Sequence, residues 1–221
     1  MGRLILSLER EQGTPVQPVA VGPFEMILWE IVGYLVDDEQ RGVAFSALRD
    51  RVGLTPRTVA AAPMKTLSEI TRLGGAMAAD ERAARLRTVA QMVLDEWHGD
   101  LAGVLKLPAQ KAKKELMKFP SVGEPGAEKI LLFSRALGVL ALESNGLRVL
   151  VRLGFGEERK SYPATYRAVR EAVIEELPED CGLLAKAHLI LREHGRTVCL
   201  RNEPVCRACV LKTDCPSARV R

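Results

Sequence analysis

"CLRNEPVCRACVLKTDC", residues 199–215, holds four of the chain's five cysteines. Six residues separate the first cysteine from the second, two the second from the third, and five the third from the fourth. Disulfides are rare in reducing compartments, and "RLILSL" near the N-terminus is too short for the apolar core of a signal peptide. Structural zinc sites usually pair their ligands as two close couples, and only Cys206 and Cys209 form such a couple. A compact loop of four thiolates suits a cubane iron–sulfur cluster equally well, so the residues alone leave zinc and a cluster open.

The composition indicates a soluble, helical protein. The 221 residues are 47% hydrophobic and 27% charged, which is enough for one large domain or two small ones. Aromatic residues make up only 5%, and the abundance of Leu, Ala, Glu, Arg and Lys favours helices. No apolar run is long enough to span a bilayer, so we expect a cytoplasmic protein, associated with the nucleoid if the source is bacterial. The net charge of +4 permits a polyanionic partner, although ordinary surface charge explains it as well.

A second pattern lies upstream of the cysteines. "KAKKELMKF", residues 111–119, predicts a short helix, and "AEKILLFSRAL", residues 127–137, predicts another that ends at Gly138. "PSVGEPG" separates them, and Pro125 suits the first turn of the second helix. Gly123 permits close approach of another backbone, and the N–H groups at a helix start can bind a phosphate. The segment is compatible with a helical hairpin that has an anion site at its turn, and an ordinary helical turn is the alternative.

The cysteine spacing, this hairpin and "HLILREHGRTVC" (residues 188–199, a predicted helix ending at Gly195) together resemble the endonuclease III family of DNA glycosylases. The resemblance covers most of the chain from about Pro23 onward. It implies an all-α, two-lobed helix-hairpin-helix fold, with a six-helix barrel over 23–137 and an iron–sulfur domain formed by 1–22 and 138–221. It also implies that a [4Fe–4S] cluster is bound by Cys199, Cys206, Cys209 and Cys215. Cys181 is left over, and we expect it to be a small buried residue.

The resemblance also implies a DNA interface. The family's hairpin reads Leu-Pro-Gly-Val-Gly, whereas this chain has Phe119-Pro-Ser-Val-Gly, so Ser121 replaces a glycine. The residues expected to contact DNA are Pro120, Ser121, Val122, Gly123, Gly126, Lys118, Lys129, Arg148 and Arg201. The alternative for the lysines of residues 111–118 is a solvated helix face. The expected partner is double-stranded DNA that contains a lesion or a mismatch, and we expect the protein to be a monomer.

The family's catalytic aspartate matches a glutamate here. In "LESNGLRV", residues 142–149, Glu143 occupies the Asp position and Arg148 matches the family's Arg. Glutamate is a poor helix N-cap, so we expect Ser144 to cap the helix that follows. A carboxylate can activate water or stabilise the positive charge on the sugar, whereas an exposed acid at a helix start with no catalytic role is the alternative.

The family's Schiff-base lysine is absent. Its position, two residues after the second hairpin glycine, is occupied by Pro125, which has no side-chain amine. Lys129 lies one helical turn later, where a phosphate contact or a surface position explains it more simply. We therefore expect base release without strand cleavage.

A third difference concerns the residue that fills the gap left by a flipped base. The family often has a glutamine there, and the ungapped match gives Leu35, with Asp38 at the family's Asp. Tyr34 can line a pocket or simply pack, and Leu35 can equally belong to the core.

Three hypotheses follow. The first is a monofunctional base-excision DNA glycosylase with Glu143 as the catalytic carboxylate. The second is a catalytically inactive [4Fe–4S] DNA-binding protein of the same fold, favoured by the losses of Asp and Lys. The third is a zinc-bound DNA-binding module.

Overall fold

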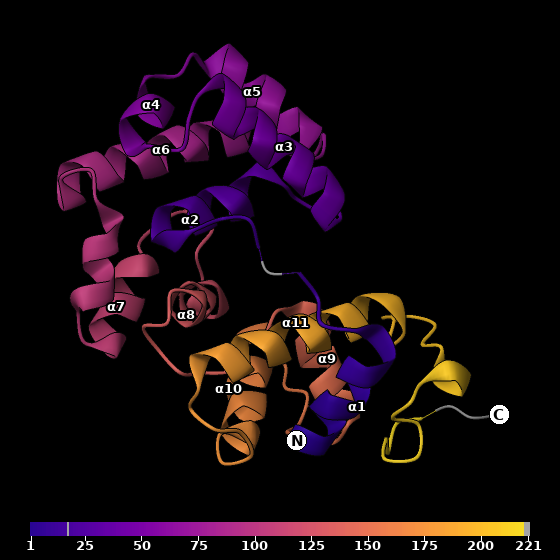
Figure 1. Cartoon of the computed structure of the whole chain (residues 1–221). Helices are drawn as coiled ribbons and strands as arrows, with labels where there is room; N and C mark the ends of the chain where they lie inside the picture. Colours follow the sequence, from indigo (N-terminus) through magenta and orange to yellow (C-terminus); the bar gives the residue numbers. More distant parts are fainter. Residues whose placement is uncertain (17, 219–221) are drawn as a thin grey trace. The chain divides into compact units, whose positions relative to one another are not determined.

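The computed structural model describes residues 1–16 and 18–218, and all regular secondary structure in them is helical (Figure 1). The predicted all-α fold class is thereby confirmed. The chain divides into two compact units. One consists of Pro18–Gly123, and the second is formed by Met1–Gln17 together with Glu124–Arg221. The sequence placed residues 124–137 in the barrel domain, whereas their packing groups them with the second unit. The functional boundary of the barrel stays a prediction.

The central unit, Pro18–Gly123, is built around one long helix. Its elements are α2 (Gly22–Val32), α3 (Asp38–Arg51), α4 (Pro56–Ala61), α5 (Met64–Leu73), α6 (Ala79–Trp97), the 3-10 helix η1 (Leu101–Lys106) and α7 (Ala109–Leu116). The long helix α6 contacts α2, α4, α5 and η1. It does so through fully buried Ala83, Leu86, Ala90 and Val93, whose spacing of three and four residues forms one apolar stripe.

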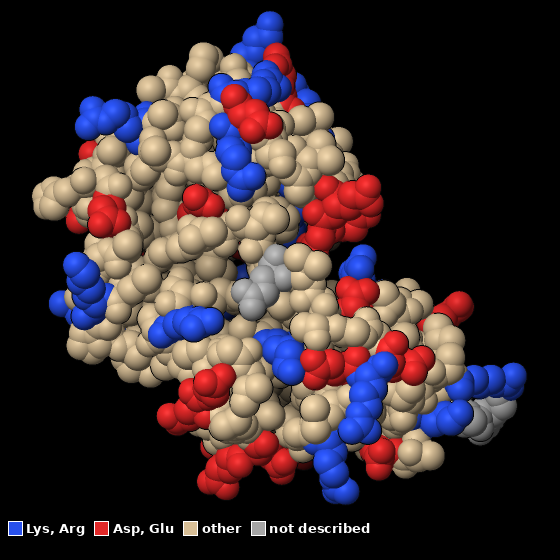
Figure 2. All heavy atoms as spheres, in the orientation of Figure 1, with Lys and Arg blue, Asp and Glu red and all other residues tan. Residues whose placement is uncertain are grey.

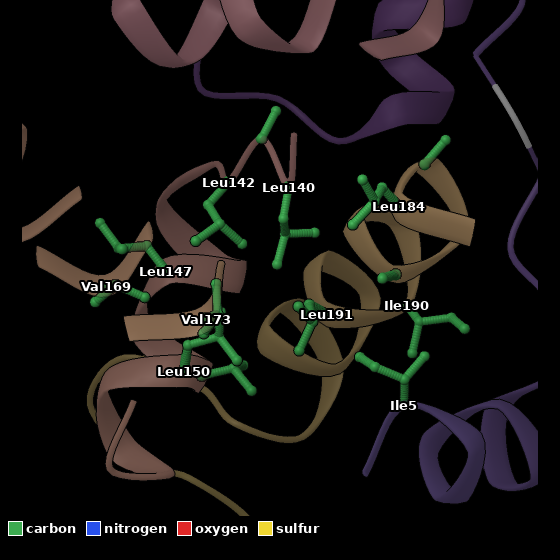
Figure 3. Packing of buried hydrophobic residues seen from close by; sticks show 14 of the residues in the cluster. Ile5, Leu140, Leu142, Leu147, Leu150, Val169, Val173, Leu184, Ile190 and Leu191 are labelled. Atoms are coloured by element: carbon green, nitrogen blue, oxygen red, sulfur yellow. The ribbon is translucent and has the colours of Figure 1, made fainter. Parts of the chain in front are cut away.

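The second unit joins the two ends of the chain. Its elements are α1 (Gly2–Gln12), α8 (Glu124–Phe133), α9 (Ser144–Arg152), α10 (Tyr162–Val173), α11 (Cys181–Thr197) and the 3-10 helix η2 (Cys206–Ala208). Figure 3 shows its core, in which Ile5 of α1 and Leu191 of α11 lie with Leu150 of α9 and Val173 of α10. Cys181 is half-buried and packs against this cluster. The N-terminal helix α1 is therefore part of the unit that carries the cysteines.

A buried ion pair fastens α8 into this second unit. Glu128, which is 1% exposed, accepts hydrogen bonds from Tyr166 and Arg170 of α10. Burial and the Glu128 charge raise the pKa of Tyr166. The hydrogen bonds satisfy both oxygens of a carboxylate that would otherwise be costly to bury.

Two predicted helix ends were wrong. The helix expected to reach Gly138 ends at Phe133, because Arg135 adopts a left-handed φ of +56° and the Ala136 N–H bonds back to the Leu131 carbonyl oxygen at 2.8 Å. The helix expected to end at Gly195 continues to Thr197. Gly195 is there for packing rather than termination, since a Cβ on it would lie 2.6 Å from the Asn145 carbonyl oxygen of α9. Across the described residues, no helix is both long and apolar enough to cross a membrane.

Candidate functional site

The four clustered cysteines line one cavity beside the end of α11. Cys199 follows that helix, and its N–H bonds to the His194 carbonyl oxygen at 2.8 Å. Cys206 is the first residue of η2. Cys209 is the C-cap of η2, and its N–H donates to the Cys206 carbonyl oxygen at 3.2 Å. Burial raises the pKa of the Cys209 thiol and that of the Cys215 thiol. Four half-buried thiols thus surround one space at a chain segment with little regular structure.

Side chains from the helices hold this segment in place. Arg152 of α9 donates to the Cys199 Sγ at 3.3 Å and to the Leu200 carbonyl oxygen at 2.7 Å. The Cys215 thiol donates to the Arg152 carbonyl oxygen at 3.3 Å. Buried His194 places its Nε2 3.6 Å from the Cys209 Sγ, and burial lowers the pKa of His194 to about 4. The cavity therefore has a guanidinium donor at the Cys199 sulfur and an imidazole nitrogen beside the Cys209 sulfur.

The donor set fits an iron–sulfur cluster. Four cysteine thiols line one shared cavity, and a cubane cluster is held by four cysteine thiolates, one for each iron. Four cysteine thiolates are also a ligand set for zinc.

Glu143 is the N-cap of α9, which corrects the expectation that Ser144 would be the cap. Its Oε1 accepts from the Gly146 N–H at 2.6 Å, and its Oε2 accepts from the Asn145 Nδ2 at 2.8 Å. The glutamate side chain thus satisfies the N–H of the third residue of the helix, as a shorter acceptor does at an ordinary N-cap. Two donors therefore fix the orientation of this carboxylate.

A hydrogen-bonded chain leads from Glu143 to the cysteine segment. Asn145 bridges to Arg148, whose Nη2 donates to the Asn145 Oδ1 at 2.9 Å. Arg148 in turn donates from Nε to the Cys199 carbonyl oxygen at 3.0 Å and from Nη2 to the Gly195 carbonyl oxygen at 2.6 Å. Burial lowers the pKa of Arg148. Arg148 thus connects Asn145, at the start of α9, with the backbone of Cys199. The expected contact of Arg148 with DNA stays a prediction.

Tyr162 interacts electrostatically with Glu143. The Tyr162 hydroxyl lies 3.5 Å from the Leu142 carbonyl oxygen, and burial together with the Glu143 charge raises the pKa of Tyr162 to about 12. Tyr162 therefore stays a neutral hydrogen-bonding group at physiological pH.

The hairpin turn adopts an unusual conformation at the replaced glycine. Ser121 has a left-handed φ of +69° and is exposed, while Phe119 and Val122 on either side are buried. The Val122 N–H closes the turn on the Phe119 carbonyl oxygen at 3.1 Å. Pro125 is the second residue of α8, which confirms its predicted place in the first turn. Lys129 and Gly126 lie on the same helix.

Leu35 is not a core residue. It is 74% exposed in the connection between α2 and α3, has a left-handed φ of +55°, and is preceded by Tyr34, which is 50% exposed. Asp38, placed at the family's Asp, lies in the first turn of α3, but Asp37 is the N-cap and accepts from the Gln40 N–H at 2.8 Å.

An arginine that the sequence analysis did not single out supports this connection. Arg82 of α6 is 3% exposed and donates to the carbonyl oxygens of Val32 at 2.6 Å and Thr71 at 2.8 Å, and also to that of Gly75. The Tyr34 N–H bonds to the Gly74 carbonyl oxygen at 3.0 Å. The sequence did hold a sign that Arg82 would be buried. It lies four residues before Leu86 and therefore falls on the apolar face of α6. Asn145, Arg152 and Tyr162 were also missed, and nothing in their sequence spacing singles them out.

On the face drawn in Figure 2, Lys and Arg are interspersed with Asp and Glu. Lys118 donates to the Glu115 Oε2 at 2.6 Å, which raises the pKa of Lys118. Arg201 is exposed on the cysteine segment. The positions of these residues are compatible with a polyanion, and their contact with one stays a prediction.

Comparison with family models of known proteins gave no match. Among curated proteins, the chain is similar to endonuclease III of Sulfolobus acidocaldarius, with 27% identity over 194 residues that cover 87% of this chain and 81% of that protein. It is also similar to endonuclease III of Thermotoga maritima, with 26% identity over 199 residues that cover 90% of this chain and 85% of the relative.

A solved structure has the same fold. It is that of a trapped endonuclease III–DNA covalent intermediate, with a TM-score of 0.78 and 21% identity, covering 98% of this chain and 94% of that one. At this identity the likeness concerns the fold.

Proposed function

Because this chain is endonuclease III-like in sequence and has the helix-hairpin-helix glycosylase fold, we propose that it is a base-excision DNA glycosylase. In this proposal it binds double-stranded DNA with a damaged or mismatched base, flips that base out of the stack and hydrolyses its N-glycosidic bond. The observation that carries the proposal is the carboxylate of Glu143, which is held by the Gly146 N–H and the Asn145 amide. The sequence resemblance matches this residue to the family's catalytic aspartate.

The geometry suits hydrolysis. As the base leaves, positive charge develops on the sugar, and a fixed carboxylate nearby stabilises it or accepts a proton from the attacking water. Each carboxylate oxygen accepts one hydrogen bond from the protein, which leaves lone pairs for a water molecule or for the sugar. Tyr162, neutral at physiological pH, supplies a hydroxyl near the same carboxylate.

We propose that the enzyme is monofunctional. A strand-cleaving member needs an amine that attacks the sugar, and Pro125 stands where the family has that lysine. Lys129 is the amine closest in sequence, one turn further along α8, and its use would make the enzyme a lyase.

We also propose that Cys199, Cys206, Cys209 and Cys215 hold a [4Fe–4S] cluster. When bound, the cluster supplies four covalent links that fix the loop. The residues of the chain prepare that loop, since Arg152 binds the carbonyl oxygens of Leu200 and Arg201 and places a donor at the Cys199 Sγ.

The test is a panel of labelled duplexes, each with one class of lesion or mismatch, with every reaction divided between hot alkali and no treatment. We expect cleavage of one class only after alkali, and Glu143→Gln to lower base release by about 10²–10⁴-fold while leaving DNA affinity unchanged. Glu171→Gln, an exposed acid on α10, is the matched control and should behave as wild type.

Other outcomes separate the alternatives. Cleavage without alkali, together with a borohydride-trapped adduct that Lys129→Ala abolishes, would make the protein a lyase. Binding to the duplexes with no base release from any of them would support a catalytically inactive DNA-binding protein, the second candidate, which the replacement of Asp by Glu143 and of Lys by Pro125 favours.

A further inference from the structure

A polar hollow of about 510 Å³ opens on the second unit, beside Glu143 but not including it. Its wall is formed by α9, by the connection that leads into α10, and by the cysteine segment. We call it the Lys160–Arg201 hollow, after the two cations from the latter two walls. The mechanism proposed above makes no use of it.

The lining of the hollow is strongly cationic. Five basic side chains face it, from Arg148, Arg152, Arg159, Lys160 and Arg201, against one carboxylate from Glu158. Such an excess of one sign in a concave, partly desolvated site attracts anions. Five basic side chains and one carboxylate give the lining a net charge of +4, which equals the net charge of the whole chain.

The cations have two different roles. Arg148 and Arg152 are half-buried and already bind backbone carbonyl oxygens, at 3.0 Å and 2.7 Å respectively, so they form a fixed floor. Lys160 and Arg201 are exposed, and within the described residues neither side chain forms an ion pair. Arg159 is paired with Glu157 at 3.2 Å. The rim therefore offers two cations that remain available to a ligand.

Neutral donors complete the site. Ser144 is the first residue of α9, and Ser161 is the N-cap of α10 with no side-chain hydrogen bond to its helix. Both hydroxyls are exposed. The start of α9 already has the Glu143 carboxylate as its cap, whereas at the start of α10 the helix dipole favours a further negative charge. Cations, hydroxyls and the start of α10 around one hollow match the oxygens of a phosphate group.

We propose that the Lys160–Arg201 hollow binds a phosphodiester group of the DNA strand that carries the flipped nucleotide. Because Ser144 follows Glu143 directly, a phosphate here lies beside the carboxylate that acts on that nucleotide. Flipping rotates a nucleotide about its backbone, so holding a neighbouring phosphate fixes where the sugar arrives. This inference rests on the proposed function.

The experiment combines altered protein with altered DNA. Affinity is measured by fluorescence anisotropy for duplexes with an uncleavable abasic analogue, each with one neutral methylphosphonate in place of a single phosphate near the analogue. The proteins are wild type, Lys160→Gln, Arg201→Gln, their double variant, and Arg10→Gln, an exposed cation of α1 on the same unit that does not line the hollow. Thermal melts verify that the surface changes leave folding intact.

We expect wild type and Arg10→Gln to lose affinity when one phosphate of the analogue's strand is neutralised, and the double variant to be indifferent to that neutralisation. The slope of log affinity against log salt should fall by about 0.9 for each phosphate contact removed. Equal penalties in wild type and double variant at every phosphate would overturn the proposal. A smaller slope without any phosphate-specific penalty would also overturn it, because it would indicate only diffuse attraction.

The two proposals can fail separately. If the hollow variants show the expected pattern but wild type releases no base from any duplex, the phosphate site stands and the glycosylase proposal falls. If base release depends on Glu143 while the hollow variants bind as wild type does, the glycosylase proposal stands and the phosphate site falls.

Discussion

Ser121 shows what a single residue contributes at the hairpin turn. Its left-handed backbone, with φ at +69°, is open to glycine at no steric cost but strains a residue with a Cβ. The family's glycine at this position has the same physical explanation. The side chain brings little in return, since among the described residues its Oγ accepts one hydrogen bond, from the Arg85 Nη1 at 3.4 Å.

We therefore expect Ser121→Gly to raise the free energy of unfolding by about 1 kcal/mol, measured by urea denaturation. The same change at Ser46, an exposed position inside α3, should lower it by roughly 0.5–1 kcal/mol, because glycine is a poor helix former. Equal effects of the two substitutions would contradict a strained turn.

At the scale of elements, the packing of α9 against α11 connects the Glu143 site with the cysteines. Gly195 lets the two helices approach until its Cα lies next to the backbone of Asn145, and Arg148 reaches across to the Gly195 carbonyl oxygen at 2.6 Å. The same contact thus positions Asn145, which holds Glu143, and the end of α11, which presents Cys199.

Gly195→Ala should lower the free energy of unfolding by about 1–3 kcal/mol, because its Cβ would lie 2.6 Å from the Asn145 carbonyl oxygen and the helices would have to separate. It should also lower base release, because Asn145 and Glu143 move with α9. Gly42→Ala is the control, since a Cβ there meets nothing within 4 Å and alanine favours the helix. A Gly195→Ala variant as stable and active as wild type would show that the close contact is not required.

At the scale of the whole molecule, residues 199–215 differ from the rest of the chain in what stabilises them. Both units have helices packed around an apolar core, whereas the regular secondary structure of residues 199–215 is one short 3-10 helix. If the four cysteines hold the proposed cluster, we expect the conformation of this loop to depend on it.

Removal of the metal by chelation should open residues 199–215 to trypsin at exposed Arg201, Arg207 and Lys212, while a fragment containing Pro18–Gly123 survives. The intact protein should carry four iron atoms per chain, measured by iron and sulfide analysis, and resist cleavage in this loop. Zinc in place of iron, or an identical tryptic pattern before and after chelation, would refute the cluster.

Sequence alone determined the class of the molecule. The helical composition, the hairpin around Pro120 and the spacing of four cysteines indicated an all-α, endonuclease III-like fold, because such signals depend on short segments of chain. The tertiary structure decided the rest. That Glu143 caps α9, that Gly195 packs rather than ends a helix, and that Arg82 and Arg152 bind distant carbonyl oxygens all depend on segments brought together by folding. A residue's local pattern fixes its own backbone preference, whereas its partner is fixed only when the helices pack.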